Sequence, residues 1–530
     1  MPITKIIIQN FKGIKDRVEI PIRPITLLFG ANSAGKSTML QALLFLRELL
    51  EGRSADTDRL STAGPSSDLG GFREFVHGRD VRNKIRIGVT LRLDADGIPD
   101  AGWQDGDQKD DLMSRELDAI REAGVELEVV WSPQDNRPYV TSYQVHLDGV
   151  LFASAEAAPG REAEIKKVNG EHPVFGPPNV EADGTEYPSD FYSMLDSTFS
   201  QCPPADEEDE RSRQRIRLGA KVIPDLSLGL PIAWANPLDD ADAAKWTFDL
   251  LNRAMTGVGK AVLNQLQAIR YIGPIRRIPE RNFQPLRSPG EDRWSDGSGA
   301  WDLICSSETN HSWLDPKAIR SLGLGLEVEQ YRYFEVPVQS CLGVMIDVVR
   351  ASPNDEDHGD RIEQGVVPSE IKGFRERSRL QLVSEANGLE LQPCEVGVGV
   401  SQVLPVAIGA MAPGYSMLAV EQPELHIHPA IQCNLGDLLA AQVIGNQDRA
   451  LLLETHSEHL LLRLLRRIRE NSEDELPPGS PPLEAEHLSV LWVEQENGEV
   501  VIKEIPVTKD GDFSEQWPKG FFEERANELF

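Results

Sequence analysis

The feature that most restricts how this chain can fold is a glycine-rich loop near the start of the sequence. An apolar stretch at residues 25–29 (ITLLF) runs directly into GANSAGKS at residues 30–37, and a helix-favouring stretch, TMLQALLFL, follows. Main-chain N–H groups of such a loop can surround phosphate oxygens, and the next helix directs its positive end toward them. The pattern therefore predicts a buried strand, a phosphate-binding loop and a helix within an α/β fold.

The residue types in this loop suit a nucleoside triphosphate with magnesium. The two glycines permit the tight turn, Lys36 carries a positive charge to the β- and γ-phosphates, and Ser37 offers a hydroxyl to Mg²⁺. We therefore expect ATP and Mg²⁺ as cofactors. The residues expected to contact them are Gly30, Asn32, Ser33, Ala34, Gly35, Lys36, Ser37 and Thr38.

Two apolar stretches near the other end of the chain predict strands that complete this site. The stretch at 417–420 (MLAV) precedes Glu421, a carboxylate placed to hold Mg²⁺ at the end of a strand. The segment ALLLETHSEH at 450–459 contains His456, which can reach a γ-phosphate from the sheet edge. Upstream, GVGVSQ at 397–402 opens a helix whose positive end, with Ser401, can cap a phosphate; ordinary helix capping is the alternative.

In this order the motifs resemble those of ABC ATPases of the SMC/RecF type, and most closely those of ATPases related to the overcoming-lysogenization-defect (OLD) proteins. The match comprises NFK at 10–12, the Walker A loop, a signature-like 397–402, a Walker B strand ending EQPELHIHP, and ETHSEH. It implies a P-loop ABC-type ATPase head with a mixed sheet, plus inserted β-rich and helical subdomains. It also implies nucleotide contacts by Lys12 and catalytic roles for Lys36, Glu421, Gln422, Glu424 and His456.

In the resembling families two heads face each other, and the signature of one head caps ATP bound to the other. Carried over, Gly399 and Ser401 would act on the partner's nucleotide, which implies a homodimer or a higher homo-oligomer. The usual signature glycines are rearranged here. The position of the family's Q-loop glutamine is open, and the segment 68–78 is one candidate for it.

A second departure concerns the general base. The family usually places a carboxylate directly after the Walker B acid, but here that residue is Gln422, which can orient water and cannot accept its proton. We therefore expect slow hydrolysis, assisted by Glu424. The alternative is a scaffold that binds ATP without hydrolysing it.

Changes of pattern along the chain predict four segments. Residues 1–82 form the first part of the ATPase head, 83–189 an inserted β-rich region, 190–390 a helical or lid region with loops, and 391–530 the rest of the head with a C-terminal extension. Alternating strands such as KIRIGVTLRL carry the second prediction, and the helical pattern from about residue 190 to 272 carries the third. The extension resembles the ending of a bacterial subgroup of these ATPases and indicates no chemistry.

Composition limits the partners. Lys and Arg total 54 against 85 Asp and Glu, a net charge of −31 that disfavours general coating of nucleic acid. One local basic cluster remains a candidate nucleic-acid contact, or else a brace for the lid: Arg270, Arg276, Arg277 and Arg281. Five cysteines without paired, metal-like spacing, and the lack of a long apolar run, favour a cytoplasmic protein without a membrane partner.

The expected function is an ATP-driven switch that controls either a partner effector, a nuclease or toxin, or a nucleic-acid transaction. The resemblance implies a role in bacterial anti-phage defence or DNA repair. No acidic nuclease cluster follows His456, so cleavage is expected on another protein. A transporter subunit is disfavoured by the long separation between Walker A and signature. A metal site among His426, His428, His456 and His459 is a further, weaker alternative, since their spacing is not diagnostic.

Overall fold

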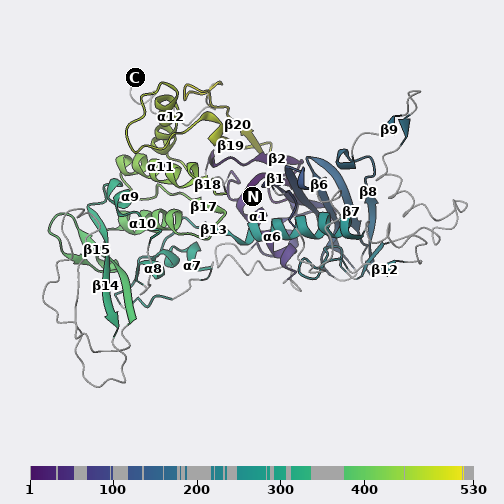
Figure 1. Ribbon diagram of the computed structural model, residues 1–530, viewed down its shortest axis with the longest axis horizontal. Helices are drawn as coiled ribbons and strands as arrows, with labels where there is room; N and C mark the ends of the chain where they lie inside the picture. The colour runs from purple at the N-terminus through teal and green to yellow at the C-terminus, as the bar shows by residue number, and fades with distance from the viewer. Residues whose placement is uncertain are drawn as a thin grey trace, which may run out of the picture.

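The computed structural model shows an elongated molecule of two lobes (Figure 1). The residues that it describes are 2–31, 34–52, 69–95, 97–99, 117–133, 136–158, 160–175, 179–180, 186–187, 216–219, 221–230, 233–234, 248–281, 283–286, 290, 292–305, 312–335, 375–446, 448–515 and 517.

A six-stranded sheet at the centre joins the two ends of the chain. Its order is β13-β17-β18-β3-β19-β20, and all neighbours are parallel except the final β19–β20 hairpin. The strands span Ile269–Ile272 (β13), Met417–Glu421 (β17), Ala450–Glu454 (β18), Ile25–Gly30 (β3), Leu488–Glu496 (β19) and Glu499–Glu504 (β20). This mixed sheet, with helices on both faces, confirms the predicted α/β P-loop fold.

Each face of this sheet has its own hydrophobic core. Successive side chains of a strand point to opposite faces, so Leu28 of β3 belongs to one core while Leu27 and Phe29 belong to the other. Helices α1 (Thr38–Glu51) and α6 (Val258–Gln267) contribute to the first core. The second core takes residues from α10 (Val398–Met411), α11 (Pro429–Ile444) and α12 (Glu458–Ser472).

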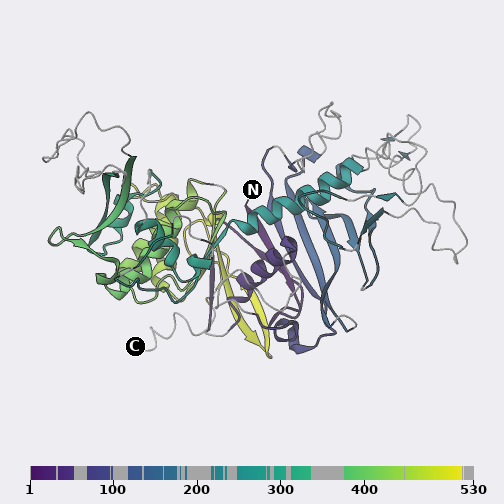
Figure 2. The ribbon, with the colours of Figure 1, turned by 90° about the horizontal axis from the view of Figure 1, so that it is seen from below.

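The other lobe is a nine-stranded antiparallel sheet in the order β12-β11-β8-β7-β6-β5-β4-β1-β2. Figure 2 shows α6 lying along one face of this sheet. Its strands span Ile3–Gln9 (β1), Val18–Pro21 (β2), Ile85–Arg92 (β4), Glu122–Ser132 (β5), Arg137–Leu147 (β6), Val150–Glu156 (β7), Ala163–Val168 (β8), Ile216–Gly219 (β11) and Ala233–Trp234 (β12).

The expected boundary between residues 82 and 83 falls between two strands of this one sheet. Strand β4 pairs with β1 from Ile3↔Leu91 to Gln9↔Arg86, so the inserted strands extend a sheet that the N-terminus begins. The alternating pattern in 83–189 correctly predicted strands. It could not show that their partner lies in the first ten residues.

The expected helical region 190–390 is mixed in structure. It supplies β13 to the central sheet, so this strand belongs to the ATPase head and not to a lid. The region also contains α6 and the strands β11 and β12 of the nine-stranded sheet. Further described elements of this region are a π-helix Asn252–Gly257 (η4), α7 (Asp292–Ser295), α8 (Ser298–Cys305), α9 (Pro316–Ser321) and the hairpin β14 (Leu326–Glu335)–β15 (Arg375–Ser384). Residues 190–215 and 235–247 lie outside the described part.

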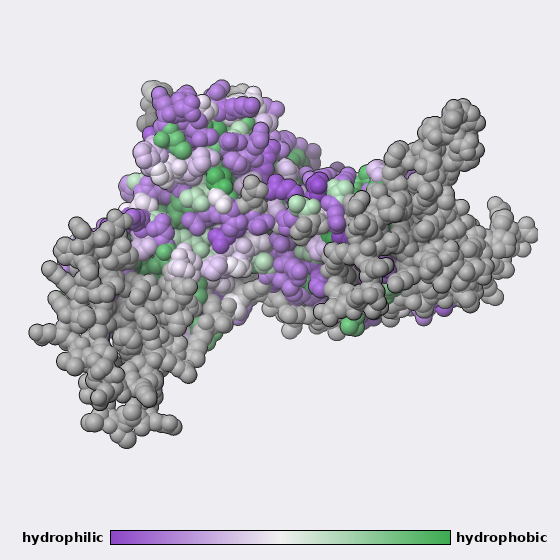
Figure 3. All heavy atoms as spheres, in the orientation of Figure 1, coloured by the Kyte–Doolittle hydropathy of each residue, from purple (hydrophilic) through white to green (hydrophobic). Residues whose placement is uncertain are grey.

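The remaining elements are short. They are α2 (Phe72–Phe75), η2 (His77–Arg79), η3 (Pro173–Phe175), the pair β9 (Asn179–Val180) and β10 (Glu186–Tyr187), β16 (Glu390–Leu391), η5 (Pro393–Glu395) and η6 (Ala485–His487). On the face drawn in Figure 3 the described surface is mainly hydrophilic, with scattered apolar residues. Among the described residues, no helix combines the length and apolar character needed to cross a membrane.

Candidate nucleotide site

The glycines of the phosphate loop are required by its backbone. Gly30 has φ +146°, and a Cβ there would lie 2.0 Å from the main-chain oxygen of Val493 on β19. Gly35 has φ +99°, with Val500 of β20 2.9 Å from its hypothetical Cβ. A side chain at either position would be strained and would collide with the C-terminal hairpin. The hairpin β19–β20 of the C-terminal extension, whose sequence indicated no chemical role, therefore packs directly against the loop.

Lys36 is held inside the loop. Its Nζ donates hydrogen bonds to the main-chain oxygens of Gly30 at 3.1 Å and Ala31 at 3.0 Å, and the residue is 3% exposed. Burial lowers the pKa of Lys36, an effect opposed mainly by the charge of Glu454. A phosphate group bound in the loop would place a negative charge beside this ammonium group. Ala34 and Thr38 are buried beside it, and the predicted contacts Asn32 and Ser33 lie outside the described residues.

A carboxylate that the motif analysis did not single out meets the loop. Ser37 Oγ donates a hydrogen bond to Glu454 Oε2 at 2.7 Å, and Glu454 Oε1 lies 3.7 Å from Lys36 Nζ. Glu454 is the last residue of β18, in register with Glu421 of β17. Its position at the end of the strand ALLLE, two residues before the expected switch histidine, is the signal that could have identified it.

Glu421 lies at the end of the neighbouring strand, as predicted. Its Oε1 accepts a hydrogen bond from the Tyr271 hydroxyl at 3.0 Å, and Tyr271 comes from β13. Burial, followed by the nearby negative charge of Glu454, raises the pKa of Glu421 to about 7. A cation between the two carboxylates would relieve both effects.

Arg276 fixes the backbone at the end of the Walker B strand, where a nucleic-acid contact had been a candidate. Its guanidinium donates to the main-chain oxygens of Glu421 at 2.6 Å and of Gln422 and Gln402 at 3.2 and 3.3 Å. Arg276 is 2% exposed, and burial lowers its pKa to about 10. The nucleic-acid prediction is therefore wrong for this residue, since all of its visible partners are protein carbonyls.

Arg270 is likewise committed to the protein. It donates to the carbonyl oxygens of Gly409, Ala412 and Pro413 at 2.6 to 2.8 Å and lies over the rings of Trp294 and Tyr415. These contacts complete the end of α10, so the nucleic-acid prediction fails here too. Arg277 and Arg281 keep exposed side chains, each near one glutamate.

Glu424 anchors the segment that carries the switch histidine. Its two carboxylate oxygens accept the Thr455 hydroxyl at 2.8 Å and the His456 main-chain N–H at 2.7 Å, and burial raises its pKa. Each oxygen of Glu424 therefore already accepts one hydrogen bond from the segment that carries His456. His456 Nε2 is buried and has no hydrogen-bond partner among the residues that the structure describes, and burial together with the charge of Lys36 lowers the pKa of this imidazole.

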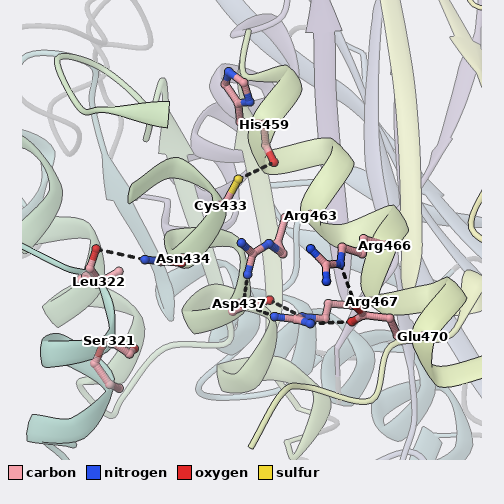
Figure 4. A network of polar contacts seen from close by, with 11 residues as sticks. Ser321, Leu322, Cys433, Asn434, Asp437, His459, Arg463, Arg466, Arg467 and Glu470 are labelled. Atoms are coloured by element: carbon pink, nitrogen blue, oxygen red, sulfur yellow. Dashed lines mark hydrogen bonds and ion pairs between the residues drawn. The ribbon is translucent and has the colours of Figure 1, made fainter. Parts of the chain in front are cut away.

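Helices behind the switch tie it to the Walker B segment (Figure 4). Asp437 of α11 accepts from Arg463 at 2.6 Å and from Arg467 at 2.7 and 2.8 Å, both on α12. Arg467 also donates to Glu470 at 2.5 Å. Because α11 follows the Walker B strand and α12 follows the switch, this network links the two segments that hold the acidic residues.

The signature-like turn opens α10, but its serine faces inward. Gly397 is the N-cap, and Ser401 Oγ donates to the main-chain oxygen of Val398 at 2.7 Å while Ser401 is fully buried. Gly399 lies against the backbone of His426. The hydroxyl predicted to contact a partner's phosphate is therefore bonded within its own helix. The exposed features of this turn are Gly397 and Val398.

Lys12 lies in a turn of left-handed backbone, with φ +51°, and its Nζ donates to Gln41 of α1 at 2.5 Å. Burial lowers the pKa of Lys12. The described part of the candidate Q-loop segment 68–78 contacts this turn. The Lys12 main-chain N–H donates to the main-chain oxygen of Phe75, and His77 Nδ1 lies 3.0 Å from the main-chain oxygen of Lys12. The segment brings no glutamine to the site.

The remaining histidines show no metal cluster. His428 Nδ1 accepts from the Ala430 N–H at 3.2 Å and caps α11. Within the described ranges no group of three or more His, Cys, Asp or Glu side chains is arranged to hold a metal ion unaided. Magnesium of a nucleotide site needs fewer protein ligands, because phosphates and water complete its shell. Ser37, Glu454 and Glu421 supply oxygen donors of the kind it prefers, so the site fits Mg²⁺ with ATP.

The family model described as an AAA ATPase domain matches residues 1–129, which contain the phosphate loop. The match supports an ATPase domain in this part of the chain, in agreement with the geometry of the loop. No curated protein matches the sequence significantly.

Three solved SMC heads align with the chain, each at TM-score 0.36. They are an SMC head bound to the C-terminal winged-helix domain of ScpA (12% identity, 96% of this chain and 99% of that chain), an SMC head from Thermotoga maritima (8%, 96% and 100%), and an SMC head with an extended coiled coil bound to the C-terminal domain of ScpA from Pyrococcus furiosus (11%, 100% and 99%).

Proposed function

We propose that the protein binds ATP with Mg²⁺ and hydrolyses it slowly as an ABC-type switch. The observation that carries this proposal is the meeting of three segments: the loop residues Lys36 and Ser37, the end of β17 and the end of β18. Two strand-end carboxylates beside a P-loop lysine and serine form a suitable cradle for a metal–triphosphate group.

The protein's own groups divide the work as follows. Lys36 neutralises charge on the β- and γ-phosphates, and Ser37 with the strand-end carboxylates holds the cation. Mg²⁺, when bound, supplies additional positive charge to the transferring phosphoryl group. His456, whose Nε2 has no partner, donates to or accepts from a group at the γ-phosphate position. Gln422 orients the attacking water without accepting its proton, which accounts for a slow rate.

The proposed oligomer is a homodimer or larger homo-oligomer in which the start of α10 faces the partner's nucleotide. Because Ser401 is buried, the groups offered to a phosphate are the free main-chain N–H groups after Gly397, at the positive end of a 14-residue helix. ATP binding would close this dimer. The closed state would act on a separate effector, a nuclease or toxin, in anti-phage defence or DNA repair within the bacterial cytoplasm.

A second candidate is an ATP-bound scaffold that holds its partner without hydrolysis. The observation that favours it is the engagement of Glu424, because both oxygens of this carboxylate already accept hydrogen bonds from the switch segment. The usual position of the general base, directly after Glu421, carries Gln422. Single-turnover incubation with labelled ATP separates the two functions. The switch converts bound ATP to ADP within minutes, whereas the scaffold returns it unaltered after hours.

The test of the nucleotide site compares ATPase rates of the wild type and Lys36→Ala. We expect loss of at least about 100-fold, the usual effect of removing one preorganised charge-stabilising group. Lys503→Ala is the matched control, because Lys503 is an exposed lysine on the hairpin that pairs with Glu494 and Glu496. Equal rates for wild type and Lys36→Ala would reject the proposed site.

A further inference from the structure

The motifs assign no role to Glu454, yet its carboxylate contacts the two side chains of the loop that would bind a metal–triphosphate group, Ser37 and Lys36. One oxygen takes the Ser37 hydroxyl at 2.7 Å and the other lies 3.7 Å from the Lys36 ammonium group. Its side chain is 12% exposed, so the carboxylate is largely withdrawn from water. This carboxylate therefore places a negative charge beside the Lys36 ammonium group, as a bound phosphate would.

The position of Glu454 relative to Glu421 is fixed by the sheet. The two residues are in register on adjacent parallel strands, whose backbones lie about 4.8 Å apart. Arg276 holds the main chain at Glu421, and Glu424 holds the main chain at His456 just after Glu454. Two acidic side chains are thus kept beside one hydroxyl at a single edge of the sheet.

We propose that Glu454 is a second carboxylate of the divalent-cation site, and that without nucleotide it restrains Lys36 and Ser37. This inference rests on the proposed binding of ATP. Ser37 and Glu454 would hold the cation through their side-chain oxygens, and Lys36 would then be free to pair with the phosphates. Oxygen donors of this kind, completed by phosphate and water, are what Mg²⁺ takes in such sites.

A dependence of ATP affinity on the cation follows from this arrangement. Without the cation, the triphosphate approaches an ionised carboxylate with nothing between the like charges. Two unit charges a few ångströms apart in a partly buried site interact strongly enough to change affinity by about tenfold or more. Glu454→Gln removes the charge but keeps the size and an oxygen that can accept from Ser37.

The experiment titrates a fluorescent ATP analogue into the full-length protein, in EDTA and in excess Mg²⁺. For the wild type we expect Mg²⁺ to tighten binding by about tenfold or more. For Glu454→Gln we expect binding in EDTA to be about tenfold tighter than wild type, and the effect of Mg²⁺ to fall below about threefold. Glu473→Gln, an exposed charge change at the end of α12, should match the wild type.

A Glu454→Gln variant that keeps the wild-type ratio between the two conditions would overturn the inference while leaving the ATP site intact. Absence of binding by the wild type would instead reject the proposed function. Glu454→Asp guards against a folding defect, because it retains the charge and must therefore keep weak binding in EDTA. Tight binding by Glu454→Asp in EDTA would also contradict the proposal. Thermal melting verifies that each variant is folded.

Discussion

Replacing Arg276 by alanine should destabilise the protein far more than replacing its neighbour Arg277. Arg276 donates to three main-chain oxygens, those of Gln402, Glu421 and Gln422, at 2.6 to 3.3 Å, and it is 2% exposed. Leaving a buried acceptor unsatisfied costs about 1–3 kcal/mol. Because water can enter part of the space left behind, we expect a total loss of about 3–5 kcal/mol in the free energy of unfolding.

Arg277 is the matched control within the same basic cluster. Its side chain is 60% exposed, and its one ion pair, with Glu280, spans 3.6 Å. Arg277→Ala should therefore cost less than about 0.5 kcal/mol. Urea unfolding followed by tryptophan fluorescence measures both variants. Equal stability of the two would refute the assignment of Arg276 as a brace for the Walker B strand, and loss of nucleic-acid binding in a stable Arg276→Ala would restore the earlier prediction.

Three further predictions concern the loop, the acidic pair and the helices behind them. Gly30→Ala should lower the free energy of unfolding by more than about 3 kcal/mol, because the new Cβ would lie 2.0 Å from the main-chain oxygen of Val493. Gly388→Ala, where φ is +65° and no atom lies near the new Cβ, should cost about 1 kcal/mol in the same urea assay. Without nucleotide and Mg²⁺, the free energy of unfolding should fall by about 2 kcal/mol as pH rises from 5 to 7.5, because Glu421 keeps its proton to about pH 7 in the folded protein and loses it near pH 4.5 in the unfolded chain. Glu421→Gln should remove this pH dependence. A stability that rises over the same pH range would contradict the raised pKa of Glu421. Asp437→Asn should lower the free energy of unfolding by about 1–3 kcal/mol, because Asp437 accepts hydrogen bonds from two arginines. Arg466→Ala, whose side chain is 62% exposed, should cost less than about 0.5 kcal/mol. A loss for Asp437→Asn as small as that for Arg466→Ala would show that the ion pairs of Asp437 in Figure 4 contribute little to stability.

The sequence predicted the parts of the fold that depend on local pattern. A continuous apolar run followed by GANSAGKS requires a buried strand, a loop and a helix, and β3 and α1 have those positions. Glu421 and His456 were placed correctly at strand ends for the same reason. Strand β13 was missed because IRYI is only four residues long and directly follows a helical pattern.

Long-range contacts explain what the sequence did not reveal. The pairing of β4 with β1, and of β19 with β3, joins segments whose own patterns contain no information about each other. Arg276 was placed in a surface cluster because arginine is usually exposed, and only the folded chain shows three carbonyls converging on it. The inward hydroxyl of Ser401 likewise depends on where α10 begins, one residue after Gly397.

The most direct test of the central claim replaces Mg²⁺ with Fe²⁺ in the presence of ATP and an oxidant. Hydroxyl radicals formed at bound iron cut the main chain close to the metal. If Ser37, Glu421 and Glu454 hold the metal together, nucleotide-dependent cuts occur in three distant segments of the chain, one beside each of these residues. Cuts confined to the phosphate loop, or cuts that do not depend on ATP, would contradict a metal site assembled from both ends of the chain.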